Sequence, residues 1–97
     1  MVKPAMDERE ILDRVTQIIR QALDNDRIVL TRSSEAGGIE GWDSIAHVHI
    51  FIAVEESFGI RFEIEELSDI PDVGALIDRI ATKLSKKWDV PDEGRYP

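Results

Sequence analysis

Hydrophobic residues near the start of the chain recur at spacings of one, three and four positions, which is typical of one apolar stripe on an α-helix. The stripe predicts a helix of about 16 residues that begins near Asp7. Acidic residues occupy its first turn and Arg20 lies near its end, so the side-chain charges complement the helix dipole. The members of the stripe are Ile11, Leu12, Val15, Ile18, Ile19, Ala22 and Leu23.

The segment SIAHVHIFIAVEESF predicts a second helix over residues 44–58. Asp43 and Ser44 supply a start signal, and Gly59 supplies the left-handed stop that often ends a helix. A surface helix needs only one apolar stripe, but here the apolar residues cover most of the circumference. Either this helix is enclosed in the core, or some of its apolar side chains face outward to meet partners. These residues are Ile45, Val48, Ile50, Phe51, Ile52 and Val54.

Residues 24–43 lack helical periodicity and are rich in turn formers, which indicates a long loop between the first two helices. We expect Ile28, Leu30 and Ile39 to anchor this loop to the core. Residues 33–38 are then left outside the core.

Residues 63–69 predict a short helical turn, and a further apolar stripe predicts a last helix with Pro71 in its first turn. The predicted fold is therefore all-α: a small antiparallel four-helix bundle with three longer helices and one short helix, and with a long loop between the first two helices. We expect one helical domain over 7–86, with flexible segments at 1–6 and 87–97. The last stripe consists of Val73, Leu76, Ile77, Ile80 and Leu84.

Charge is distributed unevenly along the chain. Residues 40–72 carry nine acidic side chains and one basic side chain, and so hold the whole formal net charge of −8. Nucleic acid is an unsuitable ligand for a surface of that sign, because phosphate contacts need basic side chains. A basic protein partner suits it better, and a solubilising acidic face is the simpler interpretation.

The sequence contains no cysteine, which excludes a disulfide framework and thiolate metal sites. No apolar run approaches the roughly 20 residues that cross a bilayer, and residues 1–10 lack the apolar core of a signal peptide. We therefore expect a cytoplasmic, monomeric protein with no membrane partner.

Ser44 has the most informative surroundings in the chain. Beside Asp43 it looks like an ordinary helix start, because either side chain can accept a hydrogen bond from an unpaired amide. Alternatively, Asp43 can cap the helix while the Ser44 hydroxyl points outward from the first turn. A phosphate ester at that position would face the positive end of the helix. From the residues alone, capping is the simpler interpretation.

The neighbours of Ser44 do not support a catalytic role. His47 lies one turn further on, but an exposed helix offers no pocket and no oxyanion hole. His47 and His49 project from roughly opposite sides of the helix, so they cannot bind one metal ion together, and both are expected at the surface or the core boundary. Adjacent carboxylates such as Glu65 and Glu66 are exposed by pattern. The sequence therefore predicts no enzyme.

Three stretches of the chain resemble the acyl carrier protein family and its related peptidyl carrier domains. GWDSI, residues 41–45, is similar to the family's Asp-Ser-Leu attachment motif, with Ile45 in place of leucine. WDSIAHVHIFIAVEESFGIRF is similar to the family's second helix and its Glu-Glu-x-Phe-Gly-Ile ending, and IPDVGALIDRI resembles its last helix. The spacing and the order of the elements over residues 7–86 also match.

The resemblance implies a carrier that is not an enzyme. A phosphopantetheinyl transferase would attach 4′-phosphopantetheine from coenzyme A to Ser44, and Asp43 would belong to the motif that the transferase recognises. The thiol of this arm would carry an acyl or aminoacyl group as a thioester, loaded by an acyl- or aminoacyl-loading ligase and presented to downstream synthase or transferase enzymes. By position, the partner-docking residues would be Ile45, Val48, Ile52, Glu55 and Glu56.

One departure from the family pattern lies early in the second helix. Housekeeping fatty-acid carriers usually have acids where this chain has Ala46 and His49, which favours a specialised polyketide, peptide or modified-acid pathway. Two alternatives stay open: a degenerate carrier-like interaction module without the prosthetic group, and an unrelated acidic helical adaptor. The intact Asp-Ser-Ile motif argues against the first, and the motif spacing argues against the second.

Overall fold

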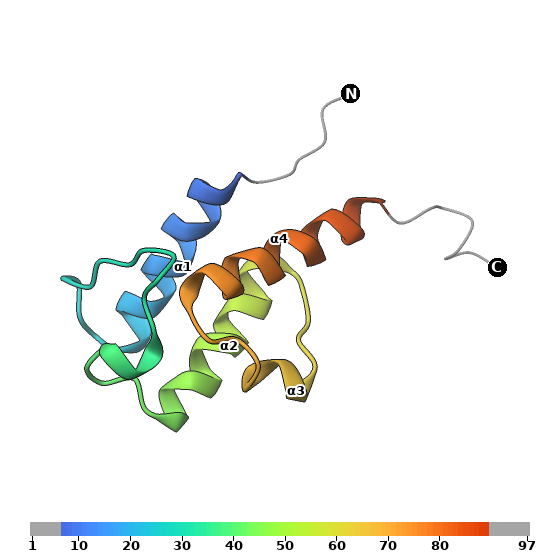
Figure 1. Cartoon of the computed structure of the whole chain (residues 1–97). Coiled ribbons are helices and arrows are strands. Elements are labelled where there is room, and N and C mark those ends of the chain that lie inside the picture. Colours follow the sequence, from blue (N-terminus) through green and yellow to red (C-terminus); the bar gives the residue numbers. More distant parts are fainter. Residues whose placement is uncertain (1–6, 90–97) are drawn as a thin grey trace.

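A computed structural model describes residues 7–89 of the chain. This part contains four α-helices and one short 3-10 helix, and no strand (Figure 1). The predicted all-α fold, with three longer helices, one short helix and a long first loop, is confirmed. Among these residues we find no helix with the length and hydrophobicity that crossing a bilayer requires. The elements are α1 (Glu8–Ala22), η1 (Ala36–Gly38), α2 (Ser44–Phe58), α3 (Ile64–Leu67) and α4 (Val73–Asp89).

The first helix begins where its sequence predicts. The Asp7 carboxylate accepts a 2.9 Å hydrogen bond from the Glu10 amide, and the Glu10 carboxylate accepts a 3.0 Å bond from the Asp7 amide. This reciprocal capping box satisfies two amides that would otherwise lack partners. The predicted stripe faces inward through Ile11, Val15 and Ile19, which are fully buried.

The core lies between the three longer helices. Helix α1 packs against both α2 and α4, and α3 lies at the edge of the bundle (Figure 1). The whole predicted stripe of α4 is buried, because an amphipathic helix gains stability by removing its apolar face from water. The buried residues are Ile11, Val15, Ile19, Ile28, Leu30, Ile50, Phe51, Val54, Phe58, Ile60, Val73, Leu76, Ile77, Ile80 and Leu84.

The start of α4 corrects one prediction. Pro71 precedes the helix and does not belong to its first turn, which begins at Val73. Asp72 is the reason, since its carboxylate accepts a 2.8 Å hydrogen bond from the Ala75 amide and so serves as the cap. At its other end the backbone of α4 continues to Asp89, past the predicted domain end at residue 86. The predicted flexible segment at 1–6 lies outside the described residues, as do residues 90–97 of the predicted flexible segment 87–97.

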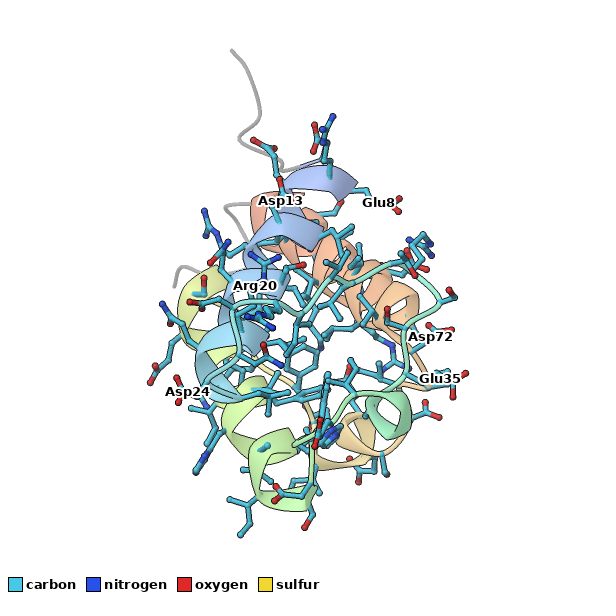
Figure 2. All side chains as sticks on the ribbon, turned by 90° about the vertical axis from the view of Figure 1, so that its left-hand side faces the viewer. Glu8, Asp13, Arg20, Asp24, Glu35 and Asp72 are labelled. Atoms are coloured by element: carbon cyan, nitrogen blue, oxygen red, sulfur yellow. The ribbon has the colours of Figure 1, made fainter. Side chains whose placement is uncertain are left out.

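The long loop is held to the bundle more closely than predicted. Ile28 and Leu30 are buried and Ile39 is half-buried, which confirms the three expected anchors. The expectation that all of residues 33–38 lie outside is wrong, because Ser34 is half-buried and its carbonyl oxygen accepts a 2.8 Å hydrogen bond from the first amide of α4. The first amides of a helix lack partners within it, and loop carbonyls supply them here. Figure 2 shows this loop crossing the face of the molecule beside Asp72.

Candidate functional site

Ser44 is the first residue of α2, and its side chain is exposed. The carboxylate of Asp43 accepts a 2.8 Å hydrogen bond from the Ala46 amide, so Asp43 caps the helix. Among the described residues, the Ser44 hydroxyl has no hydrogen-bond partner. Asp43 is therefore the cap, as the sequence allowed, and the Ser44 hydroxyl takes no part in capping.

A tight turn brings the chain to this position. Gly41 has φ of 90°, a left-handed conformation that glycine adopts without a steric penalty. The amide of Trp42 donates to the carbonyl oxygen of Ile39 at 3.2 Å, and the amide of Asp43 donates to that of Gly41 at 3.1 Å. The glycine of the GWDSI motif thus reverses the chain just before the cap.

The helix start fits a phosphate ester on Ser44. Within the described part of the chain, the amides of Ser44 and Ile45 have no acceptor, as is usual for the first positions of a helix. The first turn of α2 contains no acidic side chain. The neighbouring Asp43 carboxylate is held by its capping bond. Unpaired amides at the positive end of a helix favour an anion, so the surroundings suit a phosphodiester.

The broad apolar surface of α2 divides into two faces. Phe51, Val54 and their neighbours point into the core, whereas three predicted docking residues point outward. Of the two arrangements that the sequence allowed, the structure thus has outward-facing apolar side chains. The exposed fractions of these docking residues are large for aliphatic side chains: Ile45 67%, Val48 44% and Ile52 47%.

The two predicted docking acids differ in their surroundings. The Glu55 carboxylate is half-buried and accepts a 2.8 Å hydrogen bond from the Phe62 amide. It therefore fastens the loop that follows α2. Glu56 is exposed, and the structure shows no bond from its carboxylate to another described residue.

His47 occupies the core boundary, as predicted, and bridges two segments. The Trp42 indole Nε1 donates a 3.1 Å hydrogen bond to His47 Nδ1. Because the indole is only a donor, Nδ1 must accept and Nε2 must carry the proton. Nε2 then donates to the Leu67 carbonyl oxygen at 2.6 Å. The sequence offered no signal for this bridge, since residues 42, 47 and 67 share no pattern.

Among the described residues, neither histidine ring is hydrogen-bonded to the other or to the Ser44 hydroxyl. The ring of His47 bonds to Trp42 and Leu67, while His49 is exposed. The described residues contain no group of three or more histidine, aspartate or glutamate side chains that could hold a metal ion.

Glu66 departs from the prediction that it is exposed. Its carboxylate accepts hydrogen bonds from Arg79 at 2.7 Å, from Lys83 at 3.0 Å and from the Glu63 amide at 2.7 Å. Burial raises the pKa of this carboxyl, but the Glu63 amide and the two cations outweigh burial and lower the pKa to about 2. The prediction failed because the cations come from α4, and local sequence does not show that α3 packs beside it.

The chain is similar to several acyl carrier proteins, although no protein-family model matches it. It is 29% identical over 80 residues to the acyl carrier protein of Guillardia theta, covering 82% of this chain and 99% of that protein. It is 34% identical over 82 residues to acyl carrier protein 1, chloroplastic, of Spinacia oleracea, covering 82% of this chain and 58% of that protein. A third relative is the acyl carrier protein of Saccharopolyspora erythraea, 29% identical over 73 residues, with 75% and 77% covered.

A solved structure agrees with these relatives. The solution structure of holo acyl carrier protein from Geobacter metallireducens is 38% identical and superimposes with a TM-score of 0.76. The match covers 84% of this chain and 93% of that one. The likeness therefore extends over nearly the whole of the solved carrier.

Proposed function

The chain belongs to the acyl carrier protein family, and we propose that Ser44 is the residue that holds its prosthetic group. The protein is a carrier and not an enzyme. Its cofactor is a covalently attached 4′-phosphopantetheine. The terminal thiol of this group, when attached, holds an acyl group as a thioester.

The observation that carries the proposal is the exposed, unbonded hydroxyl of Ser44 beside a separate capping residue. A serine that capped the helix would be occupied by an amide, but Asp43 accepts that bond here. Modification of Ser44 therefore leaves the helix start intact. The unpaired amides of Ser44 and Ile45 lie at the positive end of the helix, which favours an anion such as a phosphodiester.

A second protein attaches the prosthetic group. Acyl carrier proteins interact with phosphopantetheinyl transferases and with synthase enzymes. In the described structure no basic side chain is hydrogen-bonded to the Ser44 hydroxyl, and His47 Nδ1, which lies one turn away, is occupied by Trp42. The transferase thus supplies the base that removes the hydroxyl proton, while this chain contributes an accessible hydroxyl and a rigid helix start.

The outward face of α2 suits such partners. Ile45, Val48 and Ile52 form an exposed apolar strip that begins directly beside Ser44. Glu56 adds a free carboxylate near the end of the same helix. A partner with an apolar groove and a basic rim would match this face, and Glu55 supports it indirectly by holding the following loop.

The early part of α2 favours a specialised pathway over housekeeping fatty-acid synthesis. Ala46 and His49 stand where housekeeping carriers usually have acids, so the first turns of the docking helix are not acidic. Partners that rely on basic residues would find no acidic side chain in the first turn of this helix. We propose a monomeric carrier of acyl or aminoacyl groups in such a pathway, loaded by its own ligase.

Intact mass spectrometry tests the attachment site. The protein is incubated with coenzyme A, magnesium and a promiscuous phosphopantetheinyl transferase, alongside Ser44→Ala and the matched control Ser57→Ala. Ser57 is an exposed serine at the other end of the same helix. We expect one added phosphopantetheine on the parent and on Ser57→Ala, and none on Ser44→Ala.

Other outcomes point elsewhere. Modified Ser44→Ala would move the attachment site to another residue. No added mass on the folded parent, with a known carrier modified in parallel, would favour the alternative function, a carrier-like interaction module without the prosthetic group.

A further inference from the structure

His47 joins three segments directly behind the attachment position. It lies one turn after Ser44, and its ring bonds to Trp42 in the preceding loop and to the carbonyl oxygen of Leu67 at the end of α3. Both ring nitrogens are used, so the imidazole cannot turn away without losing a hydrogen bond. The side chain therefore spans the gap between α2 and α3.

Aromatic rings fill the space behind this bridge. The centroids of His47 and Phe51 are 4.7 Å apart, and those of Phe51 and Phe62 are 5.0 Å apart in an edge-to-face arrangement. Rings at these distances are in favourable contact. The Lys83 ammonium closes the far end of this row, 5.2 Å from the centroid of the Phe62 ring.

Little free volume remains beneath the bridge. The cavity that is lined by Trp42, His47, Ile70 and Leu76, among others, measures about 20 Å³. A cavity needs about 10–15 Å³ to hold a water molecule, whereas an engineered apolar cavity that admits benzene has about 150 Å³. The cavity therefore has room for one or two water molecules and not for a long alkyl chain.

We propose that His47 closes the interior of the bundle beneath Ser44, so that the acyl group is carried outside the core. This inference rests on the proposed attachment of the prosthetic group to Ser44. His47 acts here as a specificity-determining residue, because its bridge blocks the direct path from the start of α2 to the apolar residues Ile70 and Leu76.

The closed interior defines the class of cargo. A long alkyl chain is stabilised when an apolar interior removes it from water, and a short or polar acyl group gains little from such burial. A carrier that provides no interior space thus suits short or polar acyl groups, including aminoacyl groups. A long alkyl chain on the same arm would stay exposed to solvent.

Loading with two acyl groups of different length tests this inference. Acetyl- and octanoyl-coenzyme A are used with the promiscuous transferase to load the parent, His47→Ala and the matched control His49→Ala. His49 is exposed and belongs to the same helix. Intact mass confirms each loaded form, after which the melting temperature and the amide NMR shifts of Phe51 and Leu76 are measured.

We expect the parent and His49→Ala to melt at the same temperature with either acyl group, and their core amide shifts to be independent of chain length. In His47→Ala, where the bridge is removed, we expect octanoyl to raise the melting temperature above that of the acetyl form by roughly 4–8 °C. The amides of Phe51 and Leu76 should then shift between the two forms.

Stabilisation of the octanoyl-loaded parent, together with chain-length-dependent shifts at Phe51 and Leu76, would overturn the inference. Equal behaviour of the two forms of His47→Ala would show that His47 is not the closing residue. Should His47→Ala fail to fold, Trp42→Phe replaces it, since this change removes the N–H donor to His47 Nδ1 and keeps an aromatic ring at position 42. Failure of loading in every variant would count against the attachment site itself, and mass spectrometry separates that case.

Discussion

The carbonyl oxygen of Arg32 accepts a 2.8 Å hydrogen bond from the Gly74 amide and lies 2.9 Å from the point that a Cβ atom on residue 74 would occupy. Glycine is required here for the close approach of two backbones. The contact fastens the loop between α1 and α2 to the first turn of α4. It therefore helps to place the chain that leads to η1 and on to Ser44.

Replacement of Gly74 by alanine should destabilise the protein. The new methyl group would press against a backbone oxygen, and crowding of this kind costs about 1–3 kcal/mol. Alanine in a helix recovers at most about 1 kcal/mol of that loss. We expect a net loss of stability in urea denaturation, whereas the matched change Gly37→Ala, with nothing within 4 Å of its Cβ position, should be neutral or slightly stabilising. Equal stability of the two variants would contradict the contact.

Asp43 and Ser44 should differ in their effect on stability. Asp43→Ala removes the bond to the Ala46 amide and should cost about 1 kcal/mol of unfolding free energy. Ser44→Ala removes an exposed hydroxyl without a described partner, so its effect should stay within about 0.5 kcal/mol. Chemical denaturation of the unmodified protein measures both. A large loss from Ser44→Ala with little from Asp43→Ala would show that serine is the cap.

Glu66 should make stability fall in acid. Its folded pKa of about 2 lies below the ordinary value of 4.5, so the unfolded chain binds this proton more tightly. The stabilisation is therefore complete above about pH 4.5 and is lost as the pH falls toward 2.

The change Glu66→Gln tests that titration. At neutral pH it should cost about 1.5–3 kcal/mol, the usual range for hydrogen bonds to charged groups. It should also flatten the loss of stability between about pH 4.5 and 2, measured by denaturation at a series of pH values. The exposed neighbour Glu65, changed to glutamine, should leave the pH profile as in the parent. An unchanged profile in Glu66→Gln would assign the acid sensitivity to other groups.

His47 should matter for stability before any cargo is attached. His47→Ala leaves the Trp42 indole and the Leu67 carbonyl oxygen without this partner, and should cost about 1–3 kcal/mol. His49→Ala changes an exposed residue and should stay within about 0.5 kcal/mol. Thermal denaturation of the unmodified variants measures the difference. Equal stability of His47→Ala and His49→Ala would show that the bridge between the loop and α3 does not stabilise the fold.

The positions of the helices, and of Ser44 at the start of α2, could be predicted from sequence, because their signals are local. Apolar residues repeat with the period of a helix turn in α1 and α4. The α4 stripe is buried throughout, and the α1 stripe is buried through Ile11, Val15 and Ile19. Asp43 and Gly59 mark the two ends of α2 through side-chain and backbone preferences that act within a few residues. Local preference also misplaced the start of α4, because the capping carboxylate of Asp72 outweighed the preference for Pro71 in a first turn.

Tertiary structure decided the features that join distant parts of the chain. The sequence allowed the apolar surface of α2 to be enclosed or exposed, and only packing against α1 showed that Ile45, Val48 and Ile52 face outward. The Glu66 carboxylate of α3 is paired with two cations of α4, Arg79 and Lys83. The His47 bridge needs the Trp42 indole and the Leu67 carbonyl oxygen, whose positions follow no periodic pattern with residue 47. Periodicity and capping act over one or two helix turns, whereas these contacts exist only once the helices have packed together.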